Sequence, residues 1–252
     1  MLTTRTLTRS RPPLGALVAG AAALALALTI AGAASAQTAA SPYPERAPLD
    51  QYRMASQADE AALARSAAPP AISDKAEVLV LGAAGYETAA NGTNGFVCIV
   101  ERAWASGFDD PGFWNPKIRG PICFNPASVR SVLPTYLERS RWVLAGDDRP
   151  RLVAKTKAAI AAGRIKPPEP NAMCFMMSKN GYLGDQASGG GHWHPHLMFF
   201  LPHDAAGAAA WGANVHGSPV MGGDQSDIDP AVVYFVVVAN WSDGTPGPMM
   251  GM

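Results

Sequence analysis

The strongest strand signal in this sequence is the run Val232-Val233-Tyr234-Phe235-Val236-Val237-Val238. Consecutive β-branched and aromatic residues are typical of a strand. The run is apolar on both alternating faces, which indicates a strand that is covered on both sides. We therefore predict a central strand of a sheet within Ala231–Asn240.

Shorter apolar runs of strand length precede this segment along the chain. They are Ala76–Leu81, Phe96–Trp104, Pro121–Phe124, Ala172–Ser178 and His194–Leu201. The turn-forming sequence Asn91-Gly92-Thr93-Asn94-Gly95 lies between the first two runs, so we expect these two to form an antiparallel pair.

Helix signals lie mainly between the early and the late strands. An N-cap at Asp50 predicts a helix to Ser66, before Pro69-Pro70. Asn125-Pro126 predicts a helix that breaks near Leu133, because Pro134 follows, and resumes to Leu144. A further helix is expected over Asp148–Ala162. Strands, then helices, then strands, without regular βαβ alternation, predict an α+β fold with a largely antiparallel sheet.

The N-terminus has the three parts of a cleavable secretory signal. Arg5, Arg9 and Arg11 precede an apolar run from Leu14 to about Ala33, and Ala34-Ser35-Ala36 supplies the small residues of a cleavage site. We therefore expect residues 1–36 to be a signal peptide, 37–48 a flexible leader, 49–243 a single domain and 244–252 a disordered tail. The mature chain would be periplasmic or secreted.

The charge balance changes once this signal is removed. The full chain has 20 basic and 20 acidic residues, and the mature chain keeps 17 basic and all 20 acidic ones, a net charge of −3. Nucleic acid and anionic membrane surfaces demand a basic excess, so neither is expected as the main partner. After signal cleavage no segment is long and apolar enough to span a membrane.

The three cysteines belong to an oxidising compartment if the chain is exported. Cys98 and Cys123 both lie in strand-like runs, 25 positions apart, and are the most plausible disulfide pair. Cys174 would then be a buried free thiol among apolar neighbours, although an odd cysteine can also pair between chains or react.

Four of the five histidines lie within twelve residues, and His192, His194 and His196 alternate. An extended backbone would point these three to one face, where imidazoles can bind a metal such as zinc or copper. His192 and His196 would lie about 13 Å apart in a straight strand, so two histidines and a remote ligand make the more economical site. The candidate remote ligands, by residue type only, are His203, His216, Asp185, Asp204 and Asp224.

Three readings of these histidines stay open from the sequence alone. They can form a metal site, they can be hydrogen-bonded residues at a loop entry and a strand start, or they can serve in acid–base catalysis without metal. We accordingly expect an exported protein that binds a transition metal or a small ligand through the histidine run. The alternatives are a zinc-dependent hydrolase, in which zinc activates a water, and a non-catalytic interaction domain.

Two segments of the chain, Gly92–Cys98 and Met176–Phe199, resemble a group of uncharacterised secreted bacterial proteins. The resemblance covers about Ala76 to Trp241, and its motifs are not specific to any chemistry. It implies a single exported domain in which Cys98 and Cys123 are partners. It also draws attention to His196 among the histidines, without implying a role for it.

Overall fold

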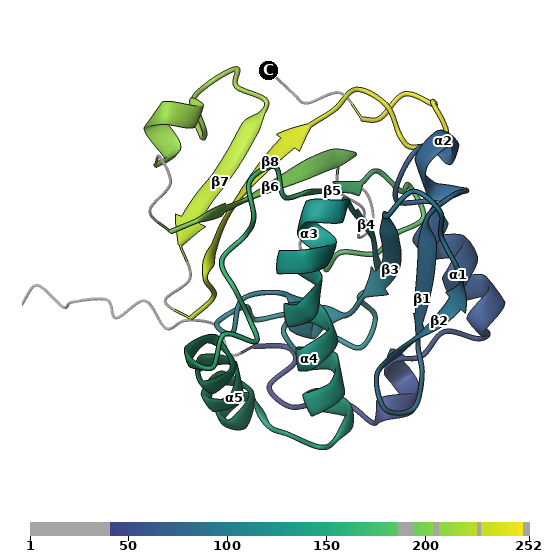
Figure 1. Ribbon diagram of the computed structural model, residues 1–252, viewed down its shortest axis with the longest axis vertical. Helices are drawn as coiled ribbons and strands as arrows, with labels where there is room; N and C mark the ends of the chain where they lie inside the picture. Colours follow the sequence, from purple (N-terminus) through teal and green to yellow (C-terminus); the bar gives the residue numbers. More distant parts are fainter. Residues whose placement is uncertain (1–40, 186–193, 204–206, 226–227, 249–252) are drawn as a thin grey trace, which may run out of the picture. The chain divides into compact units, whose positions relative to one another are not determined.

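The computed structural model describes residues 41–185, 194–203, 207–225 and 228–248. These residues form one sheet of eight strands, in the order β2-β1-β3-β4-β5-β6-β8-β7, with helices against it (Figure 1). The strands are β1 Glu77–Leu81, β2 Tyr86–Ala90, β3 Val97–Glu101, β4 Gly120–Phe124, β5 Met173–Met176, β6 His196–Pro202, β7 Val220–Gln225 and β8 Ala231–Val237. The predicted α+β class with a largely antiparallel sheet is confirmed, because all neighbouring strands except β1 and β3 pair antiparallel.

The predicted antiparallel pairing of the first two apolar runs is wrong, because β1 and β3 are parallel. An additional strand, β2, turns back from β1 and is its antiparallel neighbour, so the chain enters β3 in the direction of β1. Gly92 belongs to this return and passes close to β1, where a Cβ atom would lie 2.1 Å from the Glu77 backbone nitrogen. The glycine of the expected turn therefore allows a close backbone approach.

The strand with the strongest signal is β8, which pairs with β6 on one side and β7 on the other. It is thus flanked on both sides, as expected, but lies next to an edge of the sheet rather than at its centre. The edge strand β7 has no apolar signature, since it contains Gly222 and Gly223 at positive φ, where its register shifts against β8. Glycines at such a bulge interrupt the apolar alternation by which a strand is recognised in a sequence.

The predicted helix Asp50–Ser66 is wrong in its first part. Leu49–Tyr52 forms a 3-10 helix, η1, and α1 covers only Gln57–Arg65. The Tyr52 carbonyl accepts a hydrogen bond from the buried Arg102 Nε at 2.6 Å, so it is unavailable to a continuing helix. Ser56 begins α1 instead, and its hydroxyl accepts a hydrogen bond from the Asp59 amide.

The later helices follow the sequence signals more closely. The remaining helical elements are α2 Pro70–Ser73, η2 Ala103–Ala105, α3 Pro126–Ser131, α4 Leu133–Leu144, α5 Arg149–Ala161 and η3 Ala208–Trp211. The expected break near Leu133 separates α3 from α4, and the Asp148 carboxylate caps α5 by accepting from the Arg151 amide. Both are the consequences of local chemistry that requires no tertiary partner.

The sheet is covered by different helices on its two faces (Figure 1). Alternate residues of β3 divide between them: Val97 and Ile99 pack toward α3 and α4, whereas Cys98 and Val100 pack toward α1. Cys98 lies directly opposite Cys123 of β4, and the two form the predicted disulfide on the α1 face. Cys174 is a buried free thiol on the other face, as expected.

The described parts of the predicted leader and tail have defined contacts. In the leader, Arg46 donates to the Val143 carbonyl at 2.7 Å, and the Ala47 amide donates to the Tyr52 hydroxyl. In the tail, the Gly247 amide donates to the Ala239 carbonyl. The predicted signal peptide and residues 249–252 lie outside the described residues. None of the helices in the described ranges is long and apolar enough to cross a membrane.

Candidate ligand-binding cavity

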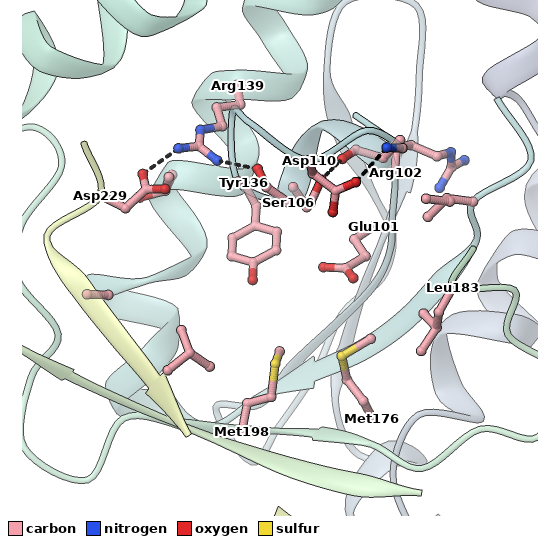
Figure 2. Close-up of a pocket in the computed structure, with 18 of the residues that line it drawn as sticks. Glu101, Arg102, Ser106, Asp110, Tyr136, Arg139, Met176, Leu183, Met198 and Asp229 are labelled. Atoms are coloured by element: carbon pink, nitrogen blue, oxygen red, sulfur yellow. Dashed lines mark hydrogen bonds and ion pairs between the residues drawn. The ribbon is translucent and has the colours of Figure 1, made fainter. Parts of the chain in front are cut away.

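A cavity of about 610 Å³ lies on the α3–α4 face of the sheet. Its floor is formed by β6 and β8, one wall by the end of β3, and another wall by α4 (Figure 2). We call it the Glu101 cavity after the residue at the end of β3. A volume of this size lies within the range of sites for small molecules.

The lining of the Glu101 cavity is mainly apolar. Two methionines, Met176 and Met198, lie along the floor, and Leu183 lies at one side (Figure 2). Further apolar side chains come from α3–α4 and from β6 and β8; they are Val132, Phe200, Val233 and Phe235. Methionine side chains adapt to irregular shapes, so this floor can accommodate apolar ligands of different shapes.

Glu101 is one of the polar residues that interrupt this apolar lining. Glu101 follows Val97 and Ile99 on the alternating face of β3, so its side chain enters the cavity beside α4 (Figure 2). Gly120 lies opposite Glu101 in the register of β4. A Cβ atom at Gly120 would lie 2.7 Å from both Cγ and Oε1 of Glu101, so the glycine leaves the space that this carboxyl occupies.

Burial among apolar groups raises the pKa of Glu101 from 4.5 to about 8. Desolvation disfavours the charged carboxylate, and no hydrogen bond or ion pair within the described residues compensates for it. At neutral pH the side chain is therefore mostly a neutral carboxylic acid. A carboxyl with a raised pKa in a cavity is a frequent mark of a binding or catalytic site.

The Tyr136 hydroxyl enters the same cavity from α4 (Figure 2). Burial, followed by the nearby Glu101, raises the pKa of Tyr136 well above 10, so its hydroxyl keeps its proton. The described residues give this hydroxyl no hydrogen-bond partner. One carboxyl and one phenol thus enter the cavity side by side, and neither has a hydrogen-bond partner among the described residues (Figure 2).

Two buried arginines that line the cavity are paired within the protein. Arg139 of α4 forms an ion pair with Asp229, and its guanidinium lies 4.3 Å from the centre of the Phe108 ring. Arg102, which follows β3, forms a buried ion pair with Glu60 at 2.9 Å. These pairs hold α4 and α1 against the segments around the cavity, and both guanidinium charges are neutralised there.

The predicted leader forms part of the cavity mouth. Tyr43 lines the cavity, and its hydroxyl donates to the Asp185 carboxylate, which also accepts from Tyr182. These bonds lower the pKa of Asp185, the one from Tyr182 most, and Lys117 lies 3.9 Å away. The mouth therefore joins the predicted leader to the segment that follows β5.

The structure places two of the three predicted site histidines; His192 lies outside the described residues. His196 begins β6, is almost fully buried and lines the Glu101 cavity. Its Nδ1 donates to the His194 carbonyl at 2.8 Å, and its ring lies 5.7 Å from that of Phe235. Burial lowers the pKa of His196 to about 4, so the imidazole is neutral at physiological pH.

His194 precedes β6, and its Nδ1 lies 3.2 Å from the Pro248 carbonyl oxygen. Among the candidate remote ligands, Asp185 is bound by tyrosines, while His203 and His216 are exposed. Asp204 and the side chain of Asp224 are not described. Within the described parts of the chain, no group of three His, Cys, Asp or Glu residues could hold a metal ion. A metal site that includes His192 stays a prediction.

Reading of the sequence missed Glu101 and Tyr136. A signal for Glu101 exists, because the alternation Val97, Ile99, Glu101 puts an acid on the buried face of a strand. No comparable signal marks Tyr136, whose position depends on how α4 lies on the sheet.

Comparison with known proteins gave no match to this chain among family models, curated proteins or solved structures. The function must therefore be inferred from the residues themselves. The resemblance to secreted bacterial proteins likewise rests only on the segments that carry it.

Proposed function

We propose that this protein is exported and binds a small, largely apolar molecule in the Glu101 cavity. The observation that carries the proposal is the cavity itself, about 610 Å³ in volume, with apolar side chains on its floor and walls. Apolar area removed from water contributes about 25 cal/mol per Å². A ligand that buries about 200 Å² of apolar surface would thus gain about 5 kcal/mol, before the cost of association.

Export is supported by the N-terminal sequence and by the Cys98–Cys123 disulfide. Disulfides persist outside the cytoplasm and are rare within it. The pairing also agrees with the chemistry expected of a periplasmic or secreted domain, in which a preformed cavity would meet ligands from the surroundings.

The binding proposal is tested with decan-1-ol, a neutral apolar probe, by isothermal titration calorimetry. Ala231 lines the floor at the start of β8, and Thr135 lines the wall on α4. Ala231→Trp and Thr135→Trp should each fill part of the cavity and weaken decanol binding at least tenfold. Ala154→Trp on the exposed face of α5 is the control and should bind as the wild type does.

Two variants on opposite walls are used because either could disturb folding. Circular dichroism and thermal melting identify a misfolded variant, and the other then serves as the test. Wild-type protein that binds neither decan-1-ol nor its charged analogues would overturn the proposal. Equal affinity in all variants would place the binding outside the Glu101 cavity and overturn it as well.

A further inference from the structure

The acids that line the Glu101 cavity differ in whether the protein itself satisfies them. Asp185 accepts hydrogen bonds from two tyrosines, and Asp229 pairs with Arg139. Asp110 accepts from the Gly112 amide at 2.5 Å. Glu101 alone of these four has no hydrogen bond or ion pair within the described residues, and desolvation by burial raises its pKa.

Within the described residues, no buried cation without a partner lies beside this carboxyl. The guanidinium groups of Arg102 and Arg139 pair with Glu60 and Asp229. Lys166 also lines the cavity but is exposed, so water solvates its charge. The other titratable groups close enough to respond to Glu101 are Tyr86, Tyr136 and Cys174, and none of these carries a positive charge.

The space for this carboxyl is provided by the neighbouring strand. A Cβ atom at position 120 would press on Cγ and Oε1 of Glu101, and Gly120 has none. The φ angle of Gly120 is not positive, so the backbone conformation does not require glycine there. A glycine in a buried strand loses packing and costs conformational entropy. Its presence beside an unpaired acid indicates that the position of the carboxyl, rather than the stability of the sheet, determines this residue.

We infer that the ligand of the Glu101 cavity is an apolar amine, whose ammonium group pairs with the Glu101 carboxylate beside the Tyr136 hydroxyl. This inference rests on the proposed function and adds the chemical class of the ligand. An ammonium group provides the partner that Glu101 lacks among the described residues, and the apolar walls contact the remainder of the molecule. Charge-assisted hydrogen bonds of this kind are about twice as strong as neutral ones.

A neutral ligand has less need of Glu101. The Tyr136 hydroxyl already offers the cavity a hydrogen-bond donor, and a serine or glutamine would offer another without the cost of burying an acid. An anionic ligand would have to compete with Asp229 for Arg139, and among the described lining residues it would find no other buried cation without an ion pair. The charge arrangement therefore favours a cation over both.

Binding of an amine at pH 7 carries a proton balance. The amine arrives as R–NH₃⁺ and Glu101 is mostly COOH, since its pKa is about 8. Formation of the R–NH₃⁺···⁻OOC pair leaves the N–H bonds of the ammonium intact, breaks the O–H bond of the acid and releases one proton to the buffer. Close to one proton per bound ligand should be released, and none should be released with a neutral ligand.

The test uses three probes with the same ten-carbon chain: decylamine, decan-1-ol and decanoate. Calorimetry is done below the critical micelle concentrations of decylamine and decanoate and below the solubility limit of decan-1-ol. Measurements in phosphate and in Tris at pH 7 give the affinity and the number of protons released. We expect decylamine to bind the wild type at least tenfold more tightly than decan-1-ol, a difference of about 1.4 kcal/mol. Proton release should accompany decylamine alone.

Two variants examine the role of the carboxyl. Glu101→Gln keeps the size of the side chain but cannot ionise, so the tenfold preference for decylamine and its proton release should both disappear. Gly120→Ala should reduce the preference by displacing the Glu101 side chain, and it provides a second measurement if Glu101→Gln folds poorly. Asp74→Asn, an exposed acid outside the cavity, is the matched control and should behave as the wild type does.

The outcomes separate this inference from the proposed function. Decan-1-ol binding without a preference for decylamine, or a preference for decanoate, would overturn the amine inference and leave the apolar cavity as the binding site. A decylamine preference that survives in Glu101→Gln would also overturn it. Failure of all three probes to bind would instead overturn the proposed function.

Discussion

The charged form of Glu101 destabilises the folded protein, because the apolar cavity desolvates the carboxylate. The protonated form is favoured in the folded protein, where the pKa is about 8, over the unfolded chain, where the ordinary value is 4.5. The stabilising contribution of protonation is therefore fully present below about pH 4.5 and is lost as the pH rises through 8. The wild type should therefore lose stability between pH 4.5 and 8. A glutamine at this position cannot ionise and should not cause this loss.

The raised pKa of Glu101 should make the stability of the protein depend on pH. The free energy of unfolding of Glu101→Gln, relative to the wild type, should rise between pH 4.5 and 8 by up to about 1.4 kcal/mol per pH unit and level off above 8. Urea unfolding of both proteins at pH 5, 6, 7, 8 and 9 measures the difference. Two curves that stay parallel over this range would show that Glu101 titrates normally.

At the scale of single residues, the sequence revealed chemistry only where neighbours along the chain are sufficient. The pairing of Cys98 with Cys123 was predictable because both lie in strand-like runs. The role of Gly120 was not, because it depends on the residue across β4 and β3, and cross-strand register cannot be read from one strand. The histidine run attracted attention by its spacing, whereas Glu101 and Tyr136, more than 30 positions apart, have no shared pattern.

Among the helices and strands, Asn125 connects α3 with β5 and with the segment that precedes β5. Its side-chain oxygen accepts from the Ser128 amide at the start of α3 and from the Met173 amide of β5, at 2.9 and 3.3 Å. Its amide nitrogen donates to the Asn171 carbonyl at 2.8 Å. One side chain thus caps a helix and joins it to a neighbouring strand.

We predict that Asn125→Ala lowers the free energy of unfolding by about 2 kcal/mol, because the helix cap and the bonds to β5 are lost together. Asn125→Asp is the comparison, since a carboxylate keeps both accepted bonds and loses only the donated one; it should cost less than half as much. Urea unfolding monitored by circular dichroism measures both. Similar losses in the two variants would assign the effect to the Asn171 contact alone.

At the scale of elements, local signals were sufficient for the helices and insufficient for the order of strands. Proline and a capping aspartate determine where α4 and α5 begin, so these boundaries were predictable. The polar strand β2 has no apolar alternation, and its insertion beside β1 reverses the direction in which the chain enters β3. Register and strand order depend on contacts across the whole sheet, and a single sequence does not display them.

For the molecule as a whole, the disulfide joins two adjacent strands and closes a loop of 25 residues. Replacing both cysteines in Cys98→Ser/Cys123→Ser should lower the free energy of unfolding by about 3 kcal/mol in the chain-entropy model. Thiol counting in denaturant should find one reactive thiol, Cys174, before reduction and three after it. Three thiols before reduction would show that the pair does not form.

The order of the strands along the chain determines when the Glu101 cavity can form. Its carboxyl and its α4 wall belong to residues 101–139, whereas its floor belongs to β6 and β8, which come near the end of the chain. A nascent chain that has emerged only through α5 already contains both bridging cysteines but has no floor over which a ligand could lie. The apolar wall residues of this half stay uncovered until β8 pairs with β6, and such surfaces promote aggregation. The Glu101 cavity is thus complete only after β8 has paired with β6.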